Sequence, residues 1–342
     1  RKAGTAAAVA RALRPRFQVV AAARAMSRVS ASPQASTGPR AEQSPGRPAL
    51  IHPAFVSGQT LRRMISLLAD TRRVGRRCLI MGVLNVTPDS FWDGGRYRQT
   101  DAAVAHGLKL IAEGADILDI GGESTRPGAA SPGVAAELER IIPVMEKLRQ
   151  LSNIPISVDT SSAEVMQAAV AAGADMINDV SALHRPGALA AAVAAGVPVC
   201  LMHMQGDPQT MQLQPRYADV VAEVKDLLLQ RAAECMAAGL AHDCLIIDPG
   251  FGFGKSLEHN LSLLRGLDVL VATGFPVLVG LSRKSMLGEL LGRSAEDRLP
   301  GSLALAVAAR QRGASIVRVH DVAATLDVFR TLDAVGGSRP SV

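Results

Sequence analysis

The chain has 342 residues, of which 48% are hydrophobic and 20% charged, enough to bury one large domain or two small ones. Its net charge of +6 comes entirely from the front, because residues 1–76 hold 14 Lys and Arg against 2 acids, whereas residues 77–342 hold 23 against 29. The positive charge therefore does not indicate a nucleic-acid groove in the body of the protein, and no run of eighteen apolar residues predicts a membrane span.

The aromatic and cysteine contents exclude further classes. Aromatic residues make up only 3% of the chain, which argues against a base-stacking platform or a carbohydrate cleft. Four cysteines without Cys-x-x-Cys spacing are too sparse for a disulfide framework and predict no cysteine-built zinc site. We therefore expect a reducing compartment, in the first place the cytoplasm.

Residues 1–54 are predicted to form a disordered basic extension, because they are rich in Ala, Arg, Ser and Pro and hold few large apolar residues. This composition is typical of an organellar transit peptide, and the internal Met26 also fits a translation start set too far upstream. Both explanations stay open, so an organelle is the alternative location. Residues 55–78 are predicted as a lead-in helix and residues 337–342 as a tail.

From residue 79 onward, short apolar runs alternate with Ala-rich amphipathic stretches, a rhythm typical of strands followed by helices. Eight runs are predicted strands: 79–86, 117–120, 154–158, 176–178, 197–202, 244–247, 276–281 and 316–319. The predicted helices cover 101–113, 135–151, 162–172, 187–195, 217–239, 257–264, 302–311 and a stretch after His320. Eight strand-then-helix units predict an α/β fold, a closed (β/α)₈ TIM barrel over residues 79–336.

An open doubly wound sheet is the alternative fold for this alternation. It usually stops near six strands and carries Gly-x-Gly-x-x-Gly after the first one, whereas this chain has Asn-Val-Thr-Pro-Asp at 85–89. Four predicted helices are followed by glycine, where a helix end takes a left-handed turn, at Gly114, Gly173, Gly196 and Gly313. The barrel is the better match.

Polar residues stand at the end of every predicted strand, which is where (β/α)₈ barrels place their active sites. A single Asp or Asn in such a place often only caps the next helix. Four of these residues, however, should share one mouth: Asp119, Asp159, Asn178 and Asp248. Such a set needs a ligand rich in hydrogen-bond donors, such as an aminopyrimidinone ring. Basic residues follow the last two strands, where such barrels often hold phosphate: Lys284, Arg318 and His320.

Longer segments around these residues resemble the dihydropteroate synthases. The resemblance is carried by residues 81–91, 119–128, 157–160, 177–179, 201–204, 248–255, 282–285 and 318–321. It runs in register from about residue 79 to 335, which is far more specific than any single motif. One departure is Trp92, in the first loop, where members commonly have a small residue. The glycine-rich run 250–255 lacks the first glycine of a nucleotide P-loop, so no such loop is predicted.

The resemblance implies an enzyme that condenses 6-hydroxymethyl-7,8-dihydropterin diphosphate with p-aminobenzoate in folate biosynthesis. The products would be 7,8-dihydropteroate and diphosphate, formed by dissociative displacement. It also implies Mg²⁺ as cofactor, small-molecule substrates, a homodimer, and inhibition by sulfonamides. Neither a nucleic acid nor a membrane is an expected partner.

The resemblance also assigns a role to each matching residue. The pterin ligands would be Asp159, Asn178, Asp248 and Lys284, with Asp119 beneath them. The diphosphate would be held by Asn85, Arg318 and His320, and Mg²⁺ would be met by Asn85. The p-aminobenzoate region would comprise Thr125, Arg126, Ser282 and Phe253. The loop carboxylate that steadies the developing cation would be Asp93, so the expected catalytic residues are Asp93, Lys284 and Arg318.

The chemistry of this reaction suits such a set of residues. Breaking the CH₂–O bond leaves positive charge on the methylene and negative charge on the diphosphate, so catalysis needs anions at one end and cations at the other. No covalent nucleophile is required, and none is predicted. Mg²⁺ commonly takes one or two protein oxygens together with phosphate and water.

Two other functions stay open from the sequence. The pterin-binding barrel of corrinoid-dependent methyltransferases shares the carboxylate pocket, but the loop at 85–91 and the residues 282–284 argue against it. A non-catalytic pterin-binding homologue would be expected to lose the loop or the anion-binding residues first, and both sets are intact here.

Overall fold

The chain divides into two units, Arg1–Leu50 and Ile51–Val342. The structure is a computed structural model and describes residues 58–71, 77–87, 96–123, 132–206, 211 and 214–336, all within the second unit. The predicted extension 1–54 and the tail 337–342 lie outside the described residues. Within this described part, no helix combines the length and the apolar character needed to cross a membrane.

Eight parallel strands form the barrel. They are β1 (Leu79–Asn85), β2 (Ile117–Gly121), β3 (Ile156–Asp159), β4 (Met176–Asp179), β5 (Val199–Met202), β6 (Leu245–Asp248), β7 (Leu278–Val279) and β8 (Ile316–Val319). They pair in the order β6-β5-β4-β3-β2-β1-β8-β7. A bridge between Ile247 and Val277 joins β6 to the residue before β7, so the ring of strands closes. The predicted TIM barrel is confirmed.

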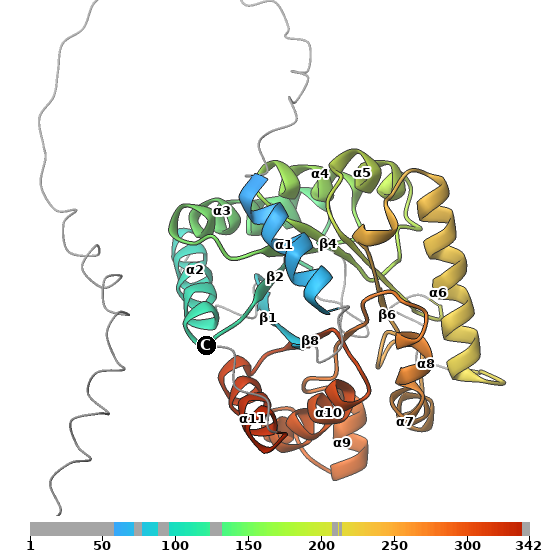
Figure 1. Cartoon of the computed structure of the whole chain (residues 1–342). Helices are drawn as coiled ribbons and strands as arrows, with labels where there is room; N and C mark the ends of the chain where they lie inside the picture. The colour runs from blue at the N-terminus through green and yellow to red at the C-terminus, as the bar shows by residue number, and fades with distance from the viewer. Residues whose placement is uncertain are drawn as a thin grey trace, which may run out of the picture. The chain divides into compact units, whose positions relative to one another are not determined.

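The helices surround the strands in chain order (Figure 1). They are α1 (Gly58–Thr71), α2 (Arg96–Ala112), α3 (Val134–Leu151), α4 (Ala163–Ala171), α5 (Ala188–Ala195), α6 (Val220–Ala237), α7 (Leu257–Arg265), α8 (Leu267–Val271), α9 (Ser285–Leu291), α10 (Leu299–Gln311) and α11 (Val322–Val335). The main apolar core lies between these helices and the outward side chains of the strands. Because the strands are covered on both faces, they are nearly continuous apolar runs.

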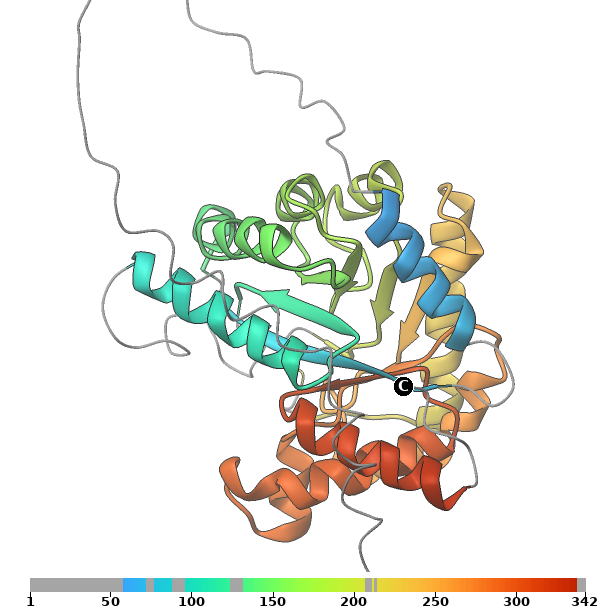
Figure 2. The same ribbon diagram turned by 60° about the vertical axis from the view of Figure 1, so that its left-hand side comes forward.

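Helix α1 covers the N-terminal end of the barrel, as the two ribbon views show (Figures 1 and 2). Its buried Met64 and Leu68 pack in one cluster with inward side chains near the starts of the strands, among them Leu79, Ile117 and Ile316. One end of the barrel interior is thereby sealed by apolar side chains. The opposite end, where the strands finish on polar residues, is left for a site.

The observed strands and helices differ from the predicted ones for local reasons. Strands β3 and β5 begin directly after Pro155 and Pro198, because these prolines have no N–H to donate to the ladder. Strand β7 begins at Leu278, two residues after Pro276, and Val277 forms only an isolated bridge to Ile247. The short helices α8 and α9 were not predicted, since five and seven residues carry too little periodicity. The four predicted glycine caps all have a positive φ, between 63° and 103°.

Candidate active site

Side chains of alternating strand residues point into the barrel, so successive inward positions form layers. The lowest layer is apolar and includes Ile117 of β2 and Ile316 of β8. Two residues further along the same strands, Asp119 and Arg318 occupy the next layer. Because inward-facing residues recur every second position, a polar layer follows directly on the apolar one.

Arg318 joins the acids of two other strands. Its Nε donates to Asp119 Oδ2 at 2.6 Å and its Nη2 donates to Asp159 Oδ2 at 2.7 Å. Asn178 of β4 also donates through Nδ2 to Asp119 Oδ2, at 3.2 Å. Four strands, β2, β3, β4 and β8, therefore meet at one hydrogen-bonded cluster.

Burial sets the electrostatics of this cluster. Desolvation raises the pKa of Asp159 to about 7, although Arg318 opposes the shift, and the neighbouring Asp119 adds to it. Desolvation works against the charge of Arg318, but Asp119 and Asp159 outweigh it and raise the pKa of the guanidinium. Asp119 is fully buried and its Oδ1 has no hydrogen-bond partner within the described residues. A buried acceptor of this kind is available to a ligand or a water molecule.

Asp248 faces the same mouth from the end of β6. Its Oδ1 accepts a hydrogen bond from the backbone N–H of Gly250 at 2.7 Å. Burial raises the pKa of Asp248 to about 6, against the opposing effects of that hydrogen bond and of Lys284. A carboxylate held by a single backbone donor keeps further lone pairs for a ligand.

Lys284 and Phe253 form the next part of the wall. Lys284 Nζ lies 4.2 Å from the centre of the Phe253 ring, a cation–π contact. Burial lowers the pKa of Lys284 to about 8, helped by the charge of Arg318 and opposed by Asp248. The ammonium remains the main form at pH 7, so the wall carries a cation beside the Asp248 carboxylate.

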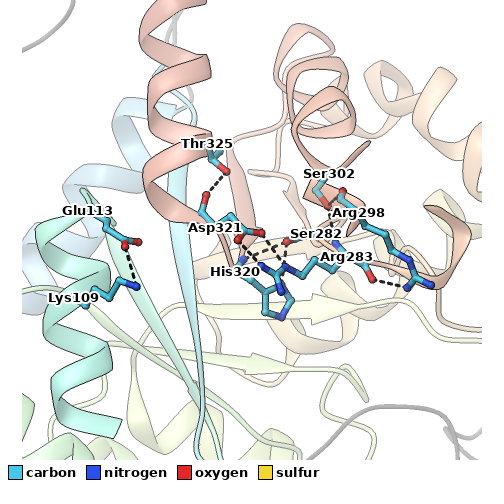
Figure 3. A network of polar contacts seen from close by, with 9 residues as sticks. All are labelled: Lys109, Glu113, Ser282, Arg283, Arg298, Ser302, His320, Asp321 and Thr325. Atoms are coloured by element: carbon cyan, nitrogen blue, oxygen red, sulfur yellow. Dashed lines mark hydrogen bonds and ion pairs between the residues drawn. The ribbon is translucent and has the colours of Figure 1, made fainter. Parts of the chain in front are cut away.

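The loops after β7 and β8 are fastened together (Figure 3). The Oγ of Ser282 lies 3.0 Å from His320 Nδ1 and accepts from the His320 backbone N–H at 3.3 Å. Partial desolvation and the neighbouring Arg318 lower the pKa of His320 to about 4, so its ring is neutral at pH 7. With Ser282 donating to Nδ1, the imidazole proton sits on Nε2 and can be donated to an anion.

Arg283, between Ser282 and Lys284, has a left-handed backbone with φ of 56°, which is strained for a residue other than glycine. The backbone and the guanidinium of Arg283 are both held: its N–H donates to Ser302 Oγ, its carbonyl accepts from Arg298, and its guanidinium donates twice to Asp321. These contacts, drawn in Figure 3, offset the strain. They aim the flanking Ser282 and Lys284 at the mouth.

The structure brings together most of the predicted site residues. Those that converge at the mouth are Asp119, Asp159, Asn178, Asp248, Phe253, Ser282, Lys284, Arg318 and His320. Asn85 ends β1 and is half-buried. Asp93, Thr125 and Arg126 lie outside the described residues, so their predicted roles stay predictions.

Sequence reasoning missed the residues that support this set. Arg283, Ser302 and Asp321 act on the loops rather than on a ligand. Arg283 and Asp321 stand at strand ends, but their pairing was not predicted, and Ser302 was not selected at all. Lys255 was passed over as part of a glycine-rich loop, yet its side chain is almost fully buried. The only available signal was a lysine placed directly after three alternating glycines.

Comparison with known proteins decides the family. Residues 81–320 match the family described as "Pterin binding enzyme". The dihydropteroate synthase of Escherichia coli K12 is 52% identical over 255 residues, which are 75% of this chain and 90% of that protein. This chain belongs to the dihydropteroate synthase family. As a member of that family it is a transferase of folate synthesis.

Solved structures of the family agree with the fold. The structure of Xanthomonas albilineans dihydropteroate synthase with 4-aminobenzoic acid is 55% identical with a TM-score of 0.73, covering 77% of this chain and 94% of that one. The Yersinia pestis dihydropteroate synthase in a sulfonamide drug complex is 48% identical with a TM-score of 0.73, covering 77% and 95%. The resemblance seen in the sequence is thus confirmed.

Proposed function

We propose that this chain condenses 6-hydroxymethyl-7,8-dihydropterin diphosphate with p-aminobenzoate, releasing diphosphate and 7,8-dihydropteroate. The observation that carries the proposal is the contact of Arg318 with both Asp119 and Asp159, which joins acids and bases of distant strands in one mouth. A reaction that separates a cationic carbon from an anionic leaving group needs anionic and cationic side chains within one mouth.

The acidic side of the mouth suits the pterin ring. The Asp248 carboxylate can accept two adjacent ring N–H groups as a fork, while Gly250 holds one of its oxygens in place. Asp159 and Asn178 would contact the ring edge from β3 and β4, with Asp119 beneath them. Lys284, placed over Phe253, would contact the ring from the opposite wall.

The basic side of the mouth suits the diphosphate. Two guanidinium nitrogens of Arg318 already contact carboxylates, which leaves Nη1 to donate to phosphate. His320 would donate from Nε2, since Ser282 occupies its Nδ1. As the CH₂–O bond breaks, its electron pair leaves with the diphosphate, and these donors stabilise the added negative charge.

The second substrate would enter from the loop side. We propose that Thr125, Arg126, Ser282 and Phe253 receive p-aminobenzoate and that Asp93 steadies the cationic methylene. The amine nitrogen then bonds to the methylene carbon and loses one proton to solvent. No side chain needs to form a covalent bond with substrate.

A magnesium ion fits the donor set at the end of β1. Asn85 offers a carboxamide oxygen, half-buried at a strand end, and Mg²⁺ is commonly held by one protein oxygen with phosphate and water. No group of three His, Cys, Asp or Glu within the described residues forms a metal site built from protein alone. We propose that Asn85 holds Mg²⁺, whose charge would help to neutralise the diphosphate.

We also propose the domain bounds, the oligomeric state, the location and the partners of this enzyme. The barrel domain would span 79–336, with 55–78 as its lead-in and 337–342 as a tail. We expect the protein to act as a homodimer in the cytoplasm on small-molecule substrates, without nucleic acid or membrane as partner. Sedimentation of the purified chain tests the dimer.

Purified protein is expected to release diphosphate only when both substrates and Mg²⁺ are present. Sulfonamides mimic p-aminobenzoate, so they should raise its apparent KM without lowering the maximal rate. Diphosphate release measured with each component left out checks the first point, and inhibition at several p-aminobenzoate concentrations checks the second. The proposed function fails if the complete mixture releases no diphosphate.

Binding of the pterin substrate should depend on pH through Asp248. Only the ionised carboxylate accepts the fork of two N–H groups, and burial raises the pKa of Asp248 to about 6. Protonation therefore removes the binding form as the pH falls, so affinity should drop up to about tenfold per pH unit below 6. Calorimetry between pH 5 and 8, corrected for the ligand's own titration, measures this. Affinity that stays constant or rises on acidification would contradict the role.

A further inference from the structure

Lys255 is a buried lysine that the proposed reaction does not use. Burial lowers its pKa to about 7, although the charge of Asp248 opposes the shift. Lys255 is only 3% exposed, although a lysine is rarely buried without an acidic partner. Within the described residues, Lys255 forms no ion pair with a carboxylate. A charged group kept in such a place needs other contacts to compensate its lost hydration.

The ammonium of Lys255 has three close acceptors, one for each of its N–H bonds. Its Nζ lies 3.0 Å from the carbonyl oxygen of Gly250, 3.0 Å from that of Phe253 and 3.0 Å from His203 Nδ1. Burial lowers the pKa of His203 to about 3, with the charge of Lys255 as the next cause, so the imidazole is a neutral acceptor. The two loops after β5 and β6 are thus joined through one side chain.

These two loops pack backbone against backbone. A Cβ at Gly250 would lie 1.9 Å from the carbonyl oxygen of His203, and one at Gly254 would lie 2.5 Å from that of Gln205. Such close packing leaves no room for a side chain at Gly250 or Gly254. Lys255 adds side-chain contacts to the backbone hydrogen bond from His203 N–H to the Asp248 carbonyl oxygen, which also joins these segments.

The β6 loop carries the ring-facing groups of the proposed site at both of its ends. At one end, Gly250 donates to the carboxylate of Asp248 and accepts from Lys255. At the other end, Phe253 accepts from Lys255 through its carbonyl and lies under the ammonium of Lys284 through its ring. One buried side chain therefore contacts the backbone beside both groups.

We propose that Lys255 is a positioning residue for the pterin ring, which it orients by fixing the β6 loop against His203. This inference rests on the proposed function. Lys255 does not touch the ring; it sets where the Asp248 carboxylate and the Phe253 ring stand. Small displacements of groups that orient a substrate strongly reduce how efficiently the enzyme binds and converts it.

The test compares Lys255→Met, which keeps the length of the side chain, with Lys109→Met on the exposed face of α2. We expect Lys255→Met to raise the KM for the dihydropterin diphosphate roughly 10- to 100-fold, to leave kcat within about threefold and to keep the wild-type circular dichroism. Lys109→Met should match the wild type. An unchanged KM, or a loss of kcat that only follows a loss of folded protein, overturns the proposal.

A second pair of variants keeps the proposal testable if Lys255→Met does not fold. His203→Asn retains an oxygen acceptor near the position of Nδ1, whereas His203→Ala removes the acceptor. The asparagine variant should keep the wild-type KM and the alanine variant should raise it about tenfold. Equal KM values for the two variants overturn the proposal. Wild-type protein assayed in parallel must release diphosphate, since inactive wild type would instead refute the proposed function.

Discussion

Replacing Asp248 by asparagine is expected to weaken binding of the dihydropterin ring by at least about 100-fold. The change keeps the size of the side chain but puts an NH₂ donor against a ring donor, and two charge-assisted hydrogen bonds of about 1.5–3 kcal/mol each are lost. The residue is 5% exposed, so water cannot replace them easily. Calorimetric titration with 6-hydroxymethyl-7,8-dihydropterin measures the effect.

Asp226→Asn is the matched control for this experiment. Asp226 lies on the exposed side of α6 and contacts only the neighbouring Lys225 among the described residues. The Asp226→Asn variant should bind the pterin ring with the affinity of the wild type. If Asp248→Asn also binds the ring with unchanged affinity, Asp248 is not the ring acceptor.

Replacing Arg318 by methionine is expected to lower both stability and turnover. Asp119 and Asp159 would lose the cation between them, and breaking a buried ion pair from one side costs roughly 3–5 kcal/mol. For a domain of this size the unfolding midpoint should fall by about 10 °C. Loss of an anion donor should lower kcat/KM at least about 100-fold. Scanning calorimetry and diphosphate release measure the two effects.

A second replacement separates the two roles of Arg318. Adding Asp119→Asn to Arg318→Met removes one of the two uncompensated carboxylates, so much of the lost stability should return. Turnover should stay low, because the donor to diphosphate is still missing. Arg330→Met, on the exposed face of α11, serves as the surface control. Recovery of turnover together with stability would contradict a role of Arg318 toward the diphosphate.

The fold could be predicted from the sequence because its signals are local. Each apolar run and each glycine cap is a signal within a few residues that specifies one strand or one helix end, and the repetition of the apolar runs eight times along the chain specifies the barrel. The strands predicted to start at Ile154, Val197 and Pro276 start two residues later, because an apolar run does not show where ladder donors begin.

The site was predictable in part, because strand ends in a barrel converge whatever their separation in sequence. Asp119 and Arg318 are 199 residues apart, and the fold alone is enough to expect them in one mouth. Their direct contact was not predictable, since it depends on side-chain reach. The partners of Arg283 and Lys255 were missed for the same reason: their contacts cross between loops whose packing no local pattern encodes.

A crystal structure of the protein with 6-hydroxymethyl-7,8-dihydropterin, magnesium and diphosphate tests the central claim most directly. The account predicts the ring against Asp159, Asn178, Asp248 and Lys284, with the diphosphate against Asn85, Arg318 and His320. A ring bound away from the C-terminal ends of the strands, or a diphosphate that does not contact Arg318 and His320, would contradict it.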